Sequence, residues 1–188
     1  MSSHHVVREK QEPALLIMSL SGFDEENFGQ LLEWSPTVIV DEAVYEQVEE
    51  AGIKIDAVVT SNKEFAVQHS TRLILTSGSP LADALKFLVG EQYHAVNVID
   101  TTFSLKDYAL FVEHISLTIF SEGKKIFTVR PGFSKWQVGG QIIELMHEVQ
   151  HLKASGVDFL DEHLLVTQKD GFYCLSFDQP FAFIAEDL

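Results

Sequence analysis

Short hydrophobic runs alternate with segments of helical spacing from residue 14 to about residue 113. The hydrophobic runs occupy residues 14–20, 38–40, 55–60, 72–76 and 94–99, and each is largely apolar, as expected for strands that are buried on both faces of a sheet. The segments between them, at 24–34, 42–51, 64–69, 81–89 and 105–114, have the spacing of helices. This alternation predicts a doubly wound α/β domain, with a parallel sheet that is covered by helices on both faces.

The period changes after residue 115. Apolar runs at 117–120 and 126–129 flank a turn-rich stretch at 121–125, which predicts a hairpin, and short strand-like runs follow at 136–138, 141–146, 164–167, 171–177 and 181–185. This pattern favours a C-terminal antiparallel β-sandwich. We therefore expect a flexible tail at residues 1–13, with His4 and His5 in it, an α/β domain at 14–114 and a sandwich domain at 115–188.

Composition narrows the classes of partner. Apolar residues make up 46% of the chain, enough for a sizeable core, and the formal net charge is −15, which argues against nucleic-acid or anionic-membrane binding. One cysteine, Cys174, excludes an intrachain disulfide, and its apolar surroundings suggest a core position. No apolar run is long enough to span a bilayer and no secretory signal pattern is present, so we expect a cytoplasmic protein.

Loops at the carboxyl ends of the predicted parallel strands are where α/β proteins bind ligands. These loops begin near Ser21, Asp41, Thr60, Ser77 and Asp100. A carboxylate at Asp41 would hold Mg²⁺ or accept a hydrogen bond from a ribose hydroxyl, or it would simply cap the helix that follows.

Two other groups of polar residues could have either a functional or a purely structural role. Lys106, Asp107 and Tyr108 follow the fifth predicted strand, where they would hold a phosphate and orient a base, or form a solvated first helical turn. His147 and His151 are four residues apart and would share one face of a helix as a metal pair. Because no third ligand is evident, we expect them to be ordinary surface histidines and assign no metal ligand.

Three segments carry a family resemblance. The stretch VDEAVYEQVEEAGIKIDAVV resembles the acidic strand end, helix and "G-I-x-P-D" segment of thiamine pyrophosphokinases, SPLADAL is similar to their "T-D-L-x-x-A-L" helix, and Asp107-Tyr108 stands where that family has an Asp-His pair. A weaker match is ASGVDF at 154–159, which is similar to a segment that lines the family's thiamine pocket. The chain thus resembles a divergent thiamine pyrophosphokinase over roughly residues 14–188.

The resemblance implies an N-terminal domain that binds ATP and Mg²⁺, a C-terminal sandwich and a homodimer through that sandwich, with thiamine bound between subunits. On these grounds we assign candidate catalytic, cofactor-binding and substrate-binding residues. The candidate catalytic residues are Asp41 and Asp107; the cofactor-binding ones are Ser21, Thr60, Ser61, Asn62, Lys63, Ser77 and Lys106; the substrate-binding ones are Asp107, Tyr108 and Phe159.

The sequence departs from the family pattern where the metal should bind. The family's "G-D-x-D-S" loop reads TSNKE here, so both aspartates are replaced and Lys63 has appeared. The acid-rich "D-K-D-x-T-D" approach reads LTSGSP, the family's arginine before Asp-His is Leu105, and no late "S-N" is evident near 171–177. Pyrophosphoryl transfer depends on charge neutralisation by Mg²⁺, which is held by carboxylates.

Two main hypotheses about function follow, beside a third in which the chain is an unrelated α/β protein with an interaction domain. In the first, the chain keeps the family frame but has lost the Mg²⁺-ATP chemistry, so that it binds a thiamine-like molecule or a nucleotide without turnover. In the second, it is an active, divergent thiamine pyrophosphokinase that uses Asp41, Glu42, Asp56 and Asp107 for metal and base roles. Lys63 would still neutralise a phosphate in either case.

Overall fold

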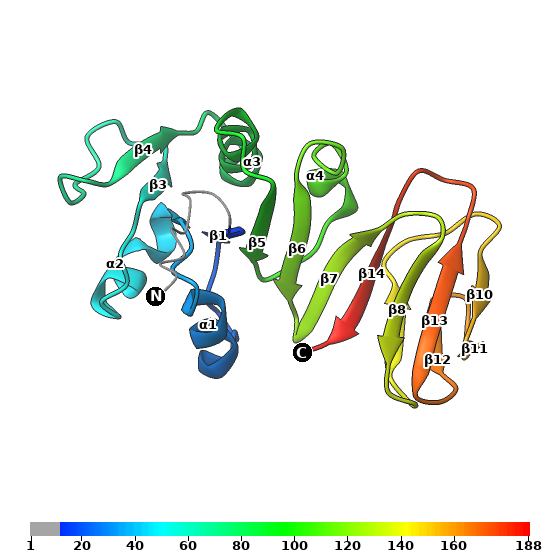
Figure 1. Ribbon diagram of the computed structural model, residues 1–188. Helices are drawn as coiled ribbons and strands as arrows, with labels where there is room; N and C mark the ends of the chain where they lie inside the picture. The colour runs from blue at the N-terminus through cyan, green and yellow to red at the C-terminus, as the bar shows by residue number, and fades with distance from the viewer. Residues whose placement is uncertain (1–11) are drawn as a thin grey trace, which may run out of the picture. The chain divides into compact units, whose positions relative to one another are not determined.

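The computed structural model describes residues 12–188, and the chain divides into two compact units, one that ends at Leu117 and one from Thr118 to Leu188 (Figure 1). The boundary expected from the sequence lay between residues 114 and 115. The strand that crosses the border, β6 (Ser116–Ser121), already begins at Ser116. The predicted tail, with His4 and His5, lies outside the described residues except for its last two positions.

The first unit is built around five parallel strands in the order β5-β1-β2-β3-β4. The doubly wound α/β arrangement predicted from the sequence is therefore confirmed. Its elements are β1 (Ala14–Ile17), α1 (Glu25–Leu32), β2 (Val38–Asp41), the 3-10 helix η1 (Glu42–Val44), α2 (Tyr45–Glu50), β3 (Ala57–Thr60), β4 (Arg72–Leu75), α3 (Pro80–Gly90), β5 (Ala95–Ile99) and α4 (Leu105–Tyr108).

Burial explains why these short runs are strands. Every residue of β1 and β3 is buried, as are the three valine and isoleucine residues of β2, so these strands are covered on both faces. The helices begin at capping side chains. Asp24 accepts a hydrogen bond from the Asn27 N–H at 2.9 Å and is the N-cap of α1, and Ser79 caps α3 in the same way.

Two predicted helices differ from the structure. Residues 64–69 form no helix, because the Asn62 side chain accepts the Glu64 N–H at 2.9 Å and closes a local turn, while Phe65 packs edge-on against Tyr45. The helix predicted at 105–114 ends at Tyr108. Hydrogen-bonded turns follow it and bring Phe111 into the core.

The second unit is antiparallel, as predicted. A larger sheet has the order β11-β12-β9-β14-β7-β6, and a three-stranded sheet has the order β10-β13-β8. The elements are β7 (Lys124–Val129), β8 (Phe133–Gln137), β9 (Ile142–Leu145), β10 (Lys153–Ser155), β11 (Val157–Phe159), β12 (Leu164–Thr167), β13 (Gly171–Ser176) and β14 (Ala182–Asp187). The predicted hairpin of β6 and β7 turns at Glu122 and Gly123, which both have positive φ, as a type I′ turn requires.

Side chains from both sheets of the second unit form one core. Tyr173 and Leu175 of β13 pack in the same cluster as Ile143, Leu165 and Ile184 of the larger sheet, so the unit is sandwich-like. The prediction that Cys174 lies in the core is wrong. Successive strand residues point to opposite faces, and because Tyr173 and Leu175 face the core, Cys174 between them is exposed.

No helix in residues 12–188 is long and apolar enough to cross a membrane.

Candidate functional site

A hollow of about 380 Å³ lies where β2, β3 and β4 end. The strands are parallel and in register, with Asp41 opposite Val59 and Thr60 opposite Leu75, so their carboxyl ends open on the same edge of the sheet. Its walls are rich in carboxylates and hydroxyls. The lining residues are Asp41, Glu42, Val59, Thr60, Ser61, Thr76, Ser77, Gly78 and Pro80.

Two adjacent carboxylates form one wall. Asp41 caps η1 by accepting the Ala43 N–H at 2.9 Å, so the capping role considered for it is real. Burial raises the pKa of the Asp41 carboxyl, the bond from Ala43 lowers it, and the neighbouring charge of Glu42 raises it again, with a net upward shift of the pKa. The Glu42 carboxylate accepts a hydrogen bond from the hydroxyl of Thr60.

The loop after β3 contributes only part of its predicted set. Thr60 is buried, and its hydroxyl also accepts the Asn62 N–H at 2.9 Å, which turns the chain away from the strand. Ser61 lines the hollow, but Asn62 and Lys63 do not. Lys63, the one cation of this loop, is exposed.

The loop after β4 forms the opposite wall and leads into α3. Thr76 donates its hydroxyl to Oδ2 of Asp83 at 2.9 Å, and the Ser77 N–H donates to the same oxygen at 3.4 Å. Lys86 donates to the other oxygen at 3.0 Å. These bonds, from Lys86 first and Thr76 second, hold the pKa of Asp83 below its usual range.

The remaining candidates of the first unit do not line this hollow. Ser21, Lys106 and Asp107 are exposed. Tyr108 is buried, stacks on Phe103 with ring centroids 5.6 Å apart, and has a hydroxyl without a hydrogen-bond partner in the described chain. Burial, with the nearby charges of two aspartates, raises the pKa of this tyrosine.

Asp100 stands at the end of β5, as the sequence predicted. The bond from the Thr101 N–H to its carboxylate, 2.7 Å long, lowers its pKa, but burial raises the pKa by more. Asp100 does not line the hollow either.

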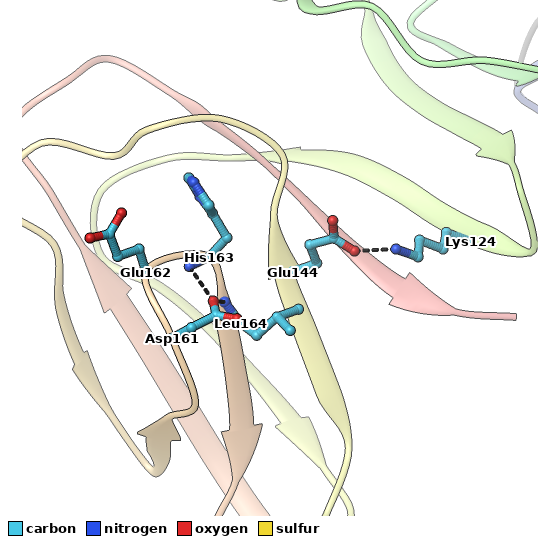
Figure 2. Close-up of a pocket in the computed structure, with 6 residues that line it drawn as sticks. All are labelled: Lys124, Glu144, Asp161, Glu162, His163 and Leu164. Atoms are coloured by element: carbon cyan, nitrogen blue, oxygen red, sulfur yellow. Dashed lines mark hydrogen bonds and ion pairs between the residues drawn. The ribbon is translucent and has the colours of Figure 1, made fainter.

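The second unit has a hollow of its own, of about 630 Å³ (Figure 2). Lys124 and Glu144 form an ion pair on one side of it. Asp161 accepts the N–H groups of His163 and Leu164, both at 2.7 Å, and these bonds lower its pKa. Periodicity did not point to this hollow, because its residues come from a hairpin and two strands that are distant in sequence. Phe159 is exposed and does not line it.

His147 and His151 do not form a metal pair on a helix, because residues 146–152 are not helical. The His147 ring accepts the Phe183 N–H at 3.0 Å through Nε2, and His151 pairs with Asp178 at 2.7 Å. Within residues 12–188, no group of three or more His, Cys, Asp or Glu side chains is placed to hold a metal ion.

Comparison with known proteins shows which fold the chain has. No protein-family model and no curated protein sequence matches the chain. Among solved structures, thiamine pyrophosphokinase from Bacillus subtilis matches with a TM-score of 0.63 and 11% identity, over 94% of this chain and 99% of the other. The chain has the thiamine pyrophosphokinase fold.

Two eukaryotic structures agree. Thiamin pyrophosphokinase from Candida albicans matches with a TM-score of 0.66 and 8% identity, over 94% of this chain and 90% of the other. The yeast enzyme matches with a TM-score of 0.65 and 7% identity, over 95% and 87%. The fold expected from the resemblance is confirmed, while identities this low leave the activity to the geometry of the site.

The thiamine pyrophosphokinase fold brings together four of the predicted site residues, namely Asp41, Thr60, Ser61 and Ser77. Thr76, Gly78 and Asp83 were missed as site residues. Thr76 and Gly78 could have been found from the sequence, because the fourth predicted strand ends at Thr76 and the loops after such strands form the site. Asp83 reaches Thr76 only once α3 has formed, so its part in this wall had no signal in the sequence.

Proposed function

We propose that this chain is a binding protein with the thiamine pyrophosphokinase fold, which holds a small molecule in the strand-end hollow without transferring pyrophosphate. One observation carries the proposal. Of the four acids that an active enzyme would recruit from the sequence, Asp41 and Glu42 line the hollow, whereas Asp56 and Asp107 do not.

Asp56 lies at the amino ends of the parallel strands, whereas the hollow lies at their carboxyl ends. It precedes β3, and its Oδ2 accepts the N–H of Val38, the first residue of β2, at 3.0 Å. Asp41 is the last residue of the same strand, so three residue steps of about 3.3 Å each separate the two positions. Since Mg²⁺ binds oxygen at about 2.1 Å, Asp41 and Asp56 cannot share one ion.

The hollow offers little to a Mg²⁺-triphosphate. One oxygen of Asp41 is used by Ala43, and one oxygen of Glu42 is used by Thr60. No lysine or arginine stands among the described residues that line the hollow. Phosphoryl transfer depends on positioning and on neutralising the charge of the phosphates. The residues present therefore do not fit the metal and nucleotide that the fold family suggests, and this supports a role in binding.

Incubation with ATP, Mg²⁺ and thiamine, followed by chromatography for thiamine diphosphate, tests the proposal. The Bacillus subtilis protein of the same fold serves as the positive control for the assay. We expect no product above the level of heat-denatured protein. Turnover on the order of 1 s⁻¹, an ordinary enzymatic rate, would refute a pure binding role.

An active, divergent pyrophosphokinase is the second candidate. It is favoured by the two adjacent carboxylates, Asp41 and Glu42, which do face one hollow. Calorimetry with Mg²⁺-ATP separates the candidates, because an active enzyme must bind this substrate and must lose affinity when Asp41→Asn is introduced. Glu50→Gln, at an exposed position of α2, is the matched control for the change in net charge.

We also propose that the second unit mediates a homodimer. Trp136 and Phe172 are paired across β8 and β13 and are 51% and 69% exposed, so the outer face of the three-stranded sheet presents two adjacent aromatic side chains. Light scattering should give twice the monomer mass for the wild type, and Phe172→Ser should shift the equilibrium to the monomer. A wild-type monomer at high concentration would contradict this proposal.

A further inference from the structure

The N-terminus of α3 faces the strand-end hollow, at a position where many α/β proteins bind an anion. α3 has 11 residues, and the loop before it supplies Ser77, Gly78 and Pro80 to the wall of the hollow. Free N–H groups and the helix dipole favour a phosphate at such a place. Whether one binds depends on which donors remain available.

Asp83, in the first turn of the helix, has taken two donors that stand beside the hollow. The hydroxyl of Thr76 and the N–H of Ser77, both from lining residues, donate to the Asp83 carboxylate at 2.9 and 3.4 Å. Lys86, a cation on the same helix, donates to this carboxylate at 3.0 Å, so its charge is already paired. The low pKa of Asp83, which these bonds cause, means that the internal anion is charged at neutral pH.

The groups that remain in the hollow suit hydroxyls rather than phosphates. Within the described chain, Oδ2 of Asp41 and Oε1 of Glu42 accept no hydrogen bond, and the side-chain hydroxyls of Ser61 and Ser77 make none. A carboxylate at the end of a parallel strand is a good acceptor for sugar hydroxyls. The same carboxylates repel a phosphate, and the chain's net charge of −15 adds to this repulsion.

We propose that Asp83 closes the hollow to phosphate groups and that the ligand of the hollow is an uncharged polyhydroxyl compound, such as a sugar. This inference rests on the proposed binding function and names the class of ligand. Asp83 is a specificity-determining residue here, because it occupies two donors of the wall and adds a negative charge beside it, while the free carboxylate oxygens of the opposite wall accept from hydroxyls.

A matched set of probes tests the charge preference of the wild-type protein. D-ribose and D-glucose are compared with ribose 5-phosphate and glucose 6-phosphate by ligand-observed NMR, which detects dissociation constants on the order of millimolar. We expect saturable binding of at least one free sugar, and phosphate esters that bind at least about fivefold more weakly. Asp41→Asn should weaken sugar binding, since it replaces an acceptor-only carboxylate by an amide.

Removal of the internal anion tests the role of Asp83. In Asp83→Ala the Thr76 hydroxyl, the Ser77 N–H and Lys86 become available, so the phosphate esters should bind roughly tenfold more tightly than to the wild type. The exposed Glu50→Ala on α2 makes the same change in net charge and should leave both ligand classes unaffected. Circular dichroism checks folding. If Asp83→Ala does not fold, Asp83→Asn replaces it; this change removes the charge and releases Lys86 but keeps an acceptor for Thr76, so a smaller gain in ester binding is expected.

Three results would overturn the inference: wild-type protein that binds the esters as tightly as the sugars, wild-type protein that binds no sugar, or Asp83 variants whose ester binding equals that of the wild type. These outcomes are separate from failure of the proposed function. Formation of thiamine diphosphate refutes the binding role, whereas ester binding without product refutes only the sugar preference.

Discussion

Lys135 should contribute more to the free energy of unfolding than an ordinary surface lysine does, because it pairs with the buried carboxylate of Glu186. In the second unit, Glu186 of β14 is 6% exposed, and its carboxylate binds Lys135 of β8 and accepts the Tyr173 hydroxyl at 3.2 Å. β8 belongs to the three-stranded sheet and β14 to the larger one, so this cluster connects the two sheets of the unit. Lys135→Met removes the cation and keeps a side chain that can pack on Phe127, over which the amine now lies.

The magnitude follows from burial. Removing one partner of a fully buried ion pair costs about 3–5 kcal/mol, since the other charge stays unpaired. The Lys135 side chain is 35% exposed, so solvent screens part of this interaction, and we expect a loss of about 2 kcal/mol in the free energy of unfolding. Glu186→Gln should cost less, because the freed lysine can turn toward water. Adding Glu186→Gln to Lys135→Met should recover about 1 kcal/mol.

Urea denaturation followed by tryptophan fluorescence measures this cycle. The chain has two tryptophans, and Trp34→Phe leaves Trp136 of β8 as the reporter for the second unit. Lys153→Met, at an exposed position of β10, is the control for loss of a lysine charge. A cost below about 0.5 kcal/mol for Lys135→Met, or no recovery in the double variant, would refute the reasoning.

Three further predictions concern single positions. Ser61→Asp adds a third carboxylate to the hollow beside Asp41 and Glu42, and calorimetry should detect Mg²⁺ binding that the wild type lacks; unchanged titrations would contradict our account of this hollow. Gly156→Ala should lower the free energy of unfolding by about 2 kcal/mol or more, because φ is +77° and a Cβ would lie 2.5 Å from the Phe172 carbonyl oxygen; denaturation equal to wild type would disprove this clash. Burial in the folded state raises the pKa of Asp41, so ionisation of this carboxyl at neutral pH lowers the free energy of unfolding, and the loss disappears as the pH falls below the unfolded pKa of about 4. Asp41→Asn should therefore be more stable than the wild type at pH 7 and equally stable in acid. Denaturation at several pH values measures this difference, and equal stability at pH 7 would contradict it.

The strands of the first unit could be predicted from the sequence because burial on both faces leaves a simple trace. Every residue of β1 and β3 is buried, and each strand therefore appears as a short apolar run. On β13 of the second unit one face is exposed, so inward and outward positions must be told apart by alternation. Cys174 was misplaced for this reason, since its aromatic and aliphatic neighbours Phe172, Tyr173 and Leu175 mask the alternation.

The sequence predicted only those residues of the candidate site that lie at the ends of strands. Asp41 and Thr60 end their strands, and Ser61 and Ser77 lie within two residues of a strand end, so all four meet in the hollow because parallel strands place their carboxyl ends together. Side chains that act through tertiary contacts left no such trace. Asp83 reaches Thr76, seven residues before it, only because the chain turns between β4 and α3 and sets the first turn of the helix beside the end of the strand.

The place of β14 in the second unit has a consequence for how this unit folds. β14 pairs with β7 on one side and β9 on the other, although both precede it by tens of residues along the chain. The β6–β7 hairpin can form early from local contacts, whereas the larger sheet must wait for the insertion of β14 between its two halves. Until then β7 and β9 expose unpaired edges. We therefore expect slow folding of this unit, and aggregation during refolding when residues 182–187 are weakened.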